Sequence, residues 1–190
     1  SKRGYTVLHV YSKSVQTPKG AVQKRYEDAI SFFDVIGISQ DKPFPKYSIF
    51  KRWLAEKSYS QKLLKITADF QPDIVISGNT PLDVQKRFMA HCKKKNIRFI
   101  FWVQDIYSFA LRLALKKKLP GIGGLIASYY KIIEKQLLEN SDQIVVISED
   151  FKKIIEKWIK NNNLTVIENW AQIDEIRPQP KKNHWSISRG

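Results

Sequence analysis

The sequence predicts an α/β fold in which a mostly parallel β-sheet lies between helices, as a three-layer sandwich. Short apolar segments alternate with longer helical patterns along the chain, which is typical of stacked βαβ units. The run from Ile97 to Val103 is apolar except for Arg98, as expected of a strand covered on both faces. With 190 residues and a hydrophobic share of 43%, the chain suits one domain with a real core.

The predicted strands are short and rich in β-branched or aromatic residues, and turn residues bound them. They cover residues 5–11, 30–38, 73–77, 97–103, 143–147 and 164–167. Proline and glycine punctuate the chain between them. DKPFP at 41–45 is a predicted loop, and so is GIGG at 121–124, which follows Pro120 and three lysines rather than a strand.

The predicted helices have apolar residues at helical spacing. They cover residues 47–70, 81–95, 125–138 and 151–160, and an amphipathic stretch spans 108–118. Thr80 is a candidate N-cap, with Pro81 at the first helical position. Lys93, Lys94 and Lys95 suit the C-terminal end of that helix, because its dipole is negative there.

Polar residues follow the ends of several predicted strands. Right-handed crossovers place these loops at one edge of the sheet, and ligands bind at that edge in open parallel sheets. Gln104 and Asp105 end the central apolar run. The corresponding loops hold Asn79, Thr80, Ser148, Glu149 and Asn169. The parallel topology by itself brings some polar loops to this edge, whether or not they form a site. Asp105 has an alternative role, which is to cap the helix that follows it.

The formal net charge of +15 predicts an anionic partner, either nucleic acid or acidic lipid. Lysine exceeds arginine, which favours a diffuse field over bidentate base recognition. The basic stretches 47–66 and 111–118 could lie on an anionic membrane, although their apolar faces could equally pack on the sheet. A basic nucleic-acid-binding α/β module without catalysis is therefore the alternative function. No RNP-like motif, zinc finger or recognition-helix pattern supports it.

Several kinds of site are absent from the sequence. It has no glycine-rich fingerprint for nucleotide phosphates, no nucleophile elbow and no metal-ligand spacing among its three histidines. The single cysteine, Cys92, allows no disulfide within one chain, which fits a reducing compartment. His91 adjoins it on a predicted helix, where neighbouring residues do not face each other. No apolar run approaches the ~20 residues needed to span a bilayer.

Several segments, taken in order, resemble those of GT-B glycosyltransferases of family four, especially members acting on bacterial polysaccharide precursors. These segments are KRGYTVLHVYS, KGAVQKRYED with FFDVIGI, PDIVISGNTPL, FWVQDIY, SDQIVVISEDFKK and LTVIENWAQIDEIRP. The resemblance covers nearly the whole chain. It implies that residues 1–170 are a Rossmann-like acceptor-binding domain that lacks the family's first strand and glycine-rich loop. Residues 171–190 would be a linker toward an absent C-terminal domain that binds the nucleotide-sugar donor.

The resemblance also implies a retaining transfer of a sugar to a polysaccharide or lipid-linked acceptor, with no metal or other cofactor. Under this hypothesis the protein is cytoplasmic and could be peripheral on the inner face of the plasma membrane, and this chain alone is inactive. The residues expected to line the acceptor cleft are Asn79, Thr80, Gln104, Asp105, Tyr107, Ser148, Glu149 and Asn169. Many members carry a histidine near the position of Gln104; this chain has none there, so its catalytic residues are not assigned.

Overall fold

A computed structural model describes residues 4–13, 32–40, 49–118, 122–160, 163–170 and 180–189. Its strands are β1 (Val7–Ser12), β2 (Phe33–Ile38), β3 (Ile74–Gly78), β4 (Arg98–Val103), β5 (Gln143–Val146) and β6 (Leu164–Val166). Its helices are α1 (Ile49–Phe70), α2 (Leu82–Lys94), α3 (Tyr107–Lys118), α4 (Ile122–Asn140), α5 (Glu149–Glu156) and α6 (His184–Arg189). The predicted Rossmann-like α/β class is confirmed. The basic loop at 14–25 and the DKPFP segment lie outside the described residues.

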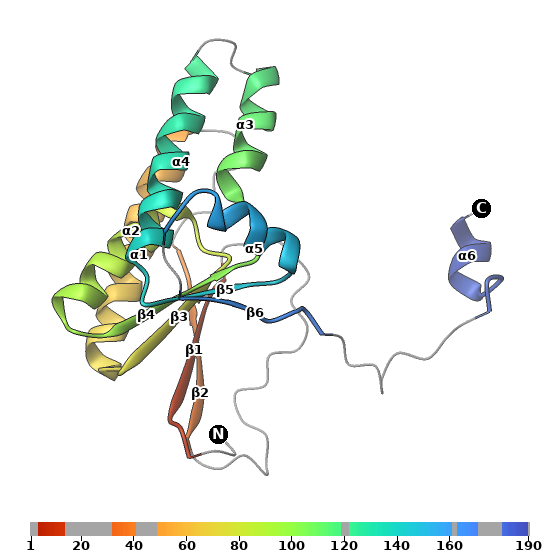
Figure 1. Cartoon of the computed structure of the whole chain (residues 1–190). Helices are drawn as coiled ribbons and strands as arrows, with labels where there is room; N and C mark the ends of the chain where they lie inside the picture. Colours follow the sequence, from red (N-terminus) through yellow and green to blue (C-terminus); the bar gives the residue numbers. More distant parts are fainter. Residues whose placement is uncertain are drawn as a thin grey trace.

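All the strand pairs are parallel. β1 pairs with β2, and a second sheet has the order β3-β4-β5-β6. Both sheets contribute to one hydrophobic core, because Ile38 of β2 belongs to it and Val10 of β1 packs against it. The two sheets therefore share one core, and the carboxyl ends of β3, β4 and β5 lie at the same edge of the larger sheet (Figure 1).

Among the described strands, β1 and β3 each have a hydrogen-bonded neighbour on one side only. Arg98 N donates to Asp73 O at 3.0 Å, so the parallel register turns the backbone groups of Ile74 and Ile76 away from β4. Val7 N donates to Phe32 O at 2.6 Å, which likewise turns Leu8 away from β2. β1 and β3 are thus edge strands among the described residues, as β2 and β6 are at the other ends of the two sheets.

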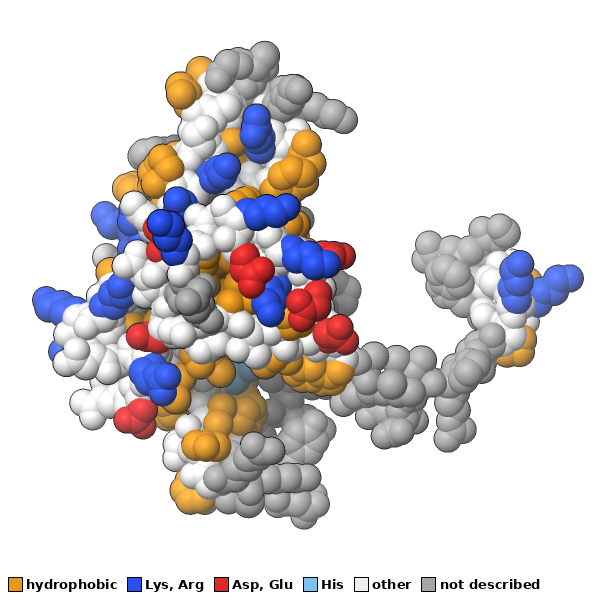
Figure 2. Space-filling model, viewed as in Figure 1, with side chains coloured by type: hydrophobic (Ala, Val, Ile, Leu, Met, Phe, Trp, Pro, Cys, Tyr) orange, Lys and Arg blue, Asp and Glu red, His pale blue; other side chains and the backbone are white. Residues whose placement is uncertain are grey.

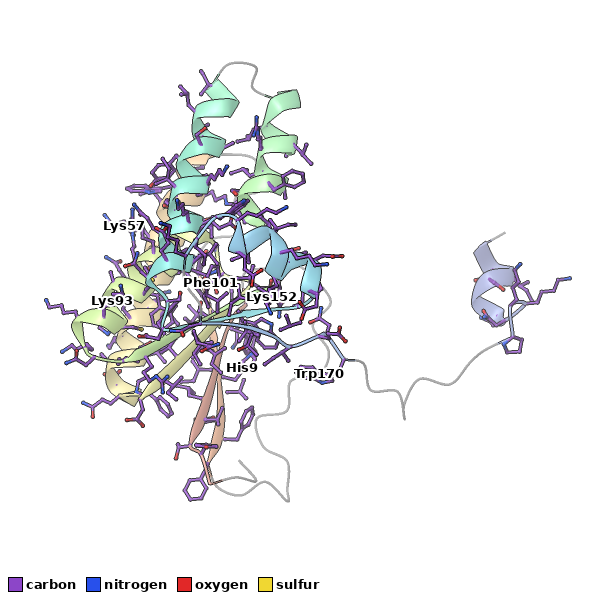
Figure 3. The ribbon with its side chains drawn as sticks, in the orientation of Figure 1. His9, Lys57, Lys93, Phe101, Lys152 and Trp170 are labelled. Atoms are coloured by element: carbon purple, nitrogen blue, oxygen red, sulfur yellow. The ribbon has the colours of Figure 1, made fainter. Side chains whose placement is uncertain are left out.

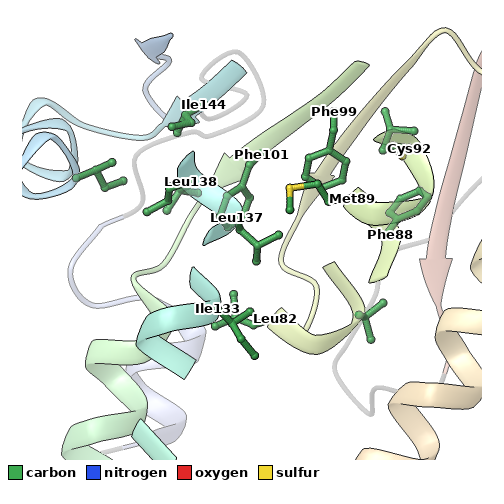
Figure 4. Close-up of a cluster of buried hydrophobic side chains, with 14 of the residues drawn as sticks. Leu82, Phe88, Met89, Cys92, Phe99, Phe101, Ile133, Leu137, Leu138 and Ile144 are labelled. Atoms are coloured by element: carbon green, nitrogen blue, oxygen red, sulfur yellow. The ribbon is translucent and has the colours of Figure 1, made fainter. Parts of the chain in front are cut away.

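The core lies on one face of the larger sheet. Burial alternates along β4, where Phe99, Phe101 and Val103 are buried. Helices α1, α2, α4 and α5 all contribute to the cluster on that face (Figures 1 and 4). On the opposite face Ile74 and Ile76 are 48% and 64% exposed. The described part of the chain thus supplies the sheet and one of the two helical layers expected in a three-layer sandwich.

The predicted loop at 121–124 is wrong for residues 122–124, which form the first turn of α4. An ideal Cβ on Gly123 would lie 2.7 Å from the Leu115 carbonyl oxygen, so glycine here lets α3 and α4 approach closely. Gly123 therefore serves helix packing rather than a turn. Within the predicted linker 171–190 the structure also places the short helix α6.

Candidate functional site

The parallel sheet brings the predicted polar loops to one edge. β3 ends at Gly78, directly before Asn79 and Thr80, and β4 ends at Val103, directly before Gln104 and Asp105. The two strands are neighbours in the sheet, with Gly78 opposite Trp102. The loops after β3 and β4 therefore lie side by side at the carboxyl edge.

Asn79 and Gln104 form an amide pair across these two loops. Asn79 has a φ of 50°, a left-handed conformation that asparagine adopts more readily than most residues. Its Nδ2 donates a hydrogen bond to Gln104 Oε1. The pair leaves an acceptor on Asn79, Oδ1, and a donor on Gln104, Nε2. This is a complementary set for hydroxyl groups of a ligand.

The backbone beneath this amide pair is held by polar side chains. Thr80 Oγ1 donates to Gly78 O at 3.0 Å, and Gln85 Nε2 donates to Thr80 O at 2.8 Å. Gln85 is 3% exposed, so it positions the loop from inside the domain. Thr80 therefore shapes the loop after β3, and its hydroxyl is used within that loop.

The remaining predicted site residues have different environments. Ser148 caps α5, because its Oγ accepts a hydrogen bond from Phe151 N at 3.3 Å. Asp105, Glu149 and Asn169 are exposed. Glu149 lies 4.0 Å from Lys152 in an ion pair. Asn79 and Gln104 are thus the two predicted residues that a hydrogen bond brings together, and Ser148 is used mainly as a helix cap.

The start of α3 depends on a residue that sequence reasoning missed. Glu134 of α4 is 1% exposed, and its carboxylate accepts hydrogen bonds from Tyr107 N at 2.8 Å, Ser108 N at 3.1 Å and Ser108 Oγ at 2.5 Å. It therefore satisfies the first N–H groups of α3, the role that the sequence left open for Asp105. Burial raises the pKa of Glu134, and these hydrogen bonds oppose that rise. A lone carboxylate within the apolar face of α4 was the available signal.

Tyr107 connects the carboxyl edge to α1. Its hydroxyl accepts a hydrogen bond from an Arg52 NH2 group at 2.9 Å, and Arg52 Nε donates to Glu56 at 2.7 Å. Burial raises the pKa of Glu56, while Arg52 acts in the opposite direction. Tyr107 thus fixes the beginning of α3 against α1 and is not free to turn toward a ligand without losing this bond. The spacing of four residues between Arg52 and Glu56 was visible in the sequence.

Two further side-chain groups lie close to this edge. Tyr130 of α4 donates to Asp83 of α2 at 2.9 Å, so α2 and α4 are tied together where both begin to cover the sheet. Trp170, 73% exposed, stacks on Trp102 of β4 with ring centroids 6.4 Å apart. This contact places the segment after β6 beside β4, so Asn169 belongs to the same edge. Figure 3 labels Trp170 at the end of this segment.

Cys92 has no role in this site. It is completely buried in the core, and burial raises the pKa of its thiol to about 11. The thiolate form needed for nucleophilic chemistry is therefore negligible near neutral pH.

A parallel Rossmann-like sheet with polar loops gathered at its carboxyl edge defines the class of α/β domains that bind a ligand at that edge. The sequence profile of Glycosyltransferase Family 4 matches residues 1–175. The chain belongs to this family, as the N-terminal domain of a GT-B transferase. Membership implies, in general, binding of a sugar acceptor and a nucleotide-sugar donor. A comparison with curated proteins found no match to the chain. Among the described helices, none combines the length and the apolar character needed to cross a bilayer.

Proposed function

We propose that residues 1–170 are the acceptor-binding part of a retaining glycosyltransferase. In this proposal a second domain, joined through residues 171–190, binds the nucleotide-sugar donor, and the acceptor is a polysaccharide or lipid-linked sugar. The observation that carries the proposal is the Asn79–Gln104 amide pair at the carboxyl edge of a family 4 domain. The enzyme needs no metal or cofactor, and this chain alone transfers no sugar.

The amide pair supports binding and orientation of the acceptor. Neither amide ionises near neutral pH, so Asn79 and Gln104 can bind hydroxyl groups but cannot remove a proton from them. A fixed pair positions the reacting hydroxyl with little loss of conformational freedom, which lowers the barrier to transfer. Thr80 and Tyr107 contribute by holding the two loops, whereas the exposed side chains of Asp105, Glu149 and Asn169 would border the acceptor.

We also propose that one strand of the sheet is missing from the described residues, as the family resemblance implies. The edges of β1 and β3 that have no described neighbour support this, because the two sheets share one core. A parallel strand between them would pair with Ile74 and Ile76 on one side and Leu8 on the other. Its carboxyl end would meet the edge beside Asn79.

Binding of defined acceptors tests the proposed function. Polyprenyl-phosphate-linked saccharides and free oligosaccharides are titrated into the chain by calorimetry. Asn79→Ala and Gln104→Ala are each expected to weaken binding about tenfold, the effect of losing about 1.4 kcal/mol of hydrogen bonding. Asn140→Ala is the matched control, because Asn140 is an exposed amide at the end of α4 that leads to the opposite edge. Equal affinities for all four proteins would contradict the proposal.

The strong positive charge also favours the alternative, a nucleic-acid-binding module. Single-stranded and duplex oligonucleotides are titrated at the same salt concentration, since both lipid and nucleic acid binding depend on salt. The transferase proposal predicts weak binding that Asn79→Ala does not change. Tight oligonucleotide binding without any acceptor binding would favour the alternative. Sugar transfer by the chain alone would contradict the proposal that a second domain binds the donor.

A further inference from the structure

Helices α3 and α4 form a hairpin that extends past the carboxyl edge of the sheet. α4 has 19 residues and is about 28 Å long, whereas β5, which follows it, has 4 residues and is about 13 Å long. The second half of α4 covers the sheet, where Ile133, Leu137 and Leu138 are buried. The first half therefore projects beyond the sheet together with α3 (Figure 1).

The projecting hairpin, defined here as residues 107–133, displays exposed apolar side chains on its described residues. On α4, Ile122, Leu125, Tyr129 and Ile132 are 63%, 74%, 51% and 58% exposed, and of these Tyr129 also donates a hydrogen bond to Asp83 at 3.3 Å. Their spacings of three, four and three residues put them on one face of the helix. On α3, Phe109 and Leu113 are 62% and 57% exposed. An apolar surface of this kind on a soluble domain marks an interaction site.

The charges on the hairpin are of one sign. The cations whose side chains the structure describes are Arg112 and Lys131, and Lys131 Nζ also lies 5.4 Å from the Trp158 ring centroid. The sequence of the hairpin adds Lys116, Lys117 and Lys118 and contains no aspartate or glutamate, although the whole chain has 18 of them. The carboxylate that follows, Glu134, is buried. In Figure 2 the upper part of the molecule accordingly shows hydrophobic and basic side chains and no acidic ones. Exposed apolar groups combined with cations alone complement an anionic lipid surface.

We propose that the projecting hairpin inserts its exposed apolar side chains into the interfacial region of an anionic bilayer, while its cations bind lipid headgroups. A protein partner or a second copy of the chain would also cover an apolar face. However, a second copy would bring like charges together, because every charged side chain of the hairpin is basic. The lipid surface is the occupant that satisfies both the apolar and the basic groups.

This geometry gives the membrane a direct relation to the candidate site. α3 begins at Tyr107, two residues after Asp105, so the hairpin leaves the sheet at the edge that carries the Asn79–Gln104 pair. Insertion of the hairpin would turn this edge toward the lipid surface. A lipid-linked acceptor would then reach the amide pair without leaving the bilayer. The inference rests on the proposed function, since it takes the acceptor to be lipid-linked, and it names the element that would associate the domain with the membrane.

The other basic stretch considered from the sequence is less suited to insertion. In α1, Trp53 is covered by cations, with Lys57 Nζ and Arg87 Cζ lying 5.6 and 5.9 Å from its ring centroid. Leu63 of the same helix is buried in the core. Leu54 is exposed by 45% and is therefore a suitable control position.

The test measures binding of the chain to vesicles of phosphatidylcholine with and without phosphatidylglycerol. The double variant Ile122→Gln/Leu125→Gln should bind anionic vesicles at least about tenfold more weakly, because two exposed apolar groups no longer enter the lipid. Leu54→Gln is the matched control and should bind as the unaltered chain does. Arg112→Gln should weaken binding and reduce its dependence on salt.

A fluorescent probe locates the inserted segment independently of affinity. Leu125→Cys and Leu54→Cys are labelled with an environment-sensitive fluorophore; Cys92 is 0% exposed and stays unlabelled in the folded protein. The probe at position 125 should shift to shorter wavelength with anionic vesicles, and the probe at position 54 should not.

The possible outcomes distinguish a failure of the hairpin inference from a failure of membrane association or of the proposed function. If the unaltered chain does not bind anionic vesicles, both the membrane association and the hairpin inference fail. If it binds but the double variant binds equally well, or the probe at position 54 shifts instead, only the hairpin inference fails. Self-association that the double variant abolishes, without vesicle binding, would make the hairpin an interface between copies. Acceptor binding in detergent and its loss in Asn79→Ala are measured separately, so the transferase proposal can fail independently.

Discussion

At the scale of single residues, two polar contacts determine the geometry of the carboxyl edge. The Asn79–Gln104 bond joins the loops after β3 and β4, and Glu134 fixes the first turn of α3. Glu134 is the costlier of these groups, since a buried carboxylate loses the hydration it has in the unfolded chain. Its three hydrogen bonds offset part of this cost. Glu134 lies between the carboxyl edge and the projecting hairpin, so its hydrogen bonds help to hold both of these parts in place.

The raised pKa of Glu134 predicts a dependence of stability on pH. Its ordinary pKa is 4.5, and burial raises the folded-state value, so the folded protein holds the proton more tightly than the unfolded chain. The unaltered chain should therefore gain stability relative to the Glu134→Gln variant as the pH falls. The difference in free energy of unfolding between the two proteins should rise between a pH above the folded-state pKa and a pH below the ordinary pKa. Urea unfolding of both proteins across this range measures the difference. The raised pKa of Glu56 is present in both proteins and largely cancels.

Parallel pH profiles for the two proteins would contradict this account of Glu134. A relative loss of stability in the unaltered chain as the pH falls would contradict it more strongly. That result would mean that the hydrogen bonds to the carboxylate outweigh its burial and that the folded-state pKa is lowered.

At the scale of elements, close packing of α3 on α4 depends on Gly123. A Cβ at this position would meet backbone atoms of Leu115, whereas a Cβ on Gly124 would meet nothing within 4 Å. We expect Gly123→Ala to destabilise the domain by about 1–3 kcal/mol, as overpacking does. Gly124→Ala should instead stabilise it by up to about 1 kcal/mol through helix propensity. Chemical unfolding of both variants measures these effects. Similar changes in both would mean that the helices do not approach closely at Gly123.

The unpaired edge of β3 predicts a pattern of amide hydrogen exchange. The register directs the Ser77 N–H toward β4 and the Ile76 N–H toward the edge without a described neighbour. We therefore expect the Ile76 amide to exchange much faster than the Ser77 amide in this chain. NMR detection of both amides in deuterated solvent makes the comparison within one strand. Equal protection would show that another segment already pairs with this edge.

The sequence predicted the elements better than it predicted their ends and contacts. Strand periodicity and the apolar run at 97–103 identify the parallel sheet, because burial leaves a direct trace in residue type. The predicted loop at GIGG was wrong for residues 122–124, because glycine occurs both in loops and at close helix contacts. Only the contact between Gly123 and Leu115 in the structure distinguishes the two. Glu134 was missed because its partners, Tyr107 and Ser108, are 27 and 26 residues away. The predicted topology implied that the loops meet at one edge. The hydrogen bond between Asn79 and Gln104 could not be predicted from the sequence and is seen only in the structure.

At the scale of the whole molecule, one edge of the sheet carries two proposals. The amide pair is proposed to bind the acceptor, and the hairpin that leaves the same edge is proposed to bind lipid. The charge of +15 agrees with the second proposal and says nothing about the first. Membership in Glycosyltransferase Family 4 supports the first and does not require the second. The two proposals therefore have separate tests, although together they describe one surface facing a membrane-bound acceptor.

The most direct test of the central claim is an NMR titration of the isotope-labelled chain with a polyprenyl-phosphate-linked saccharide in detergent. The account predicts that the side-chain amide resonances of Asn79 and Gln104 shift, together with the backbone amides of residues 78–80 and 104–107. Detergent alone, and the same titration with Asn79→Ala, serve as controls. Saccharide-dependent shifts confined to other surfaces, or none at this edge at saturating ligand, would contradict the assignment of the carboxyl edge as the acceptor site.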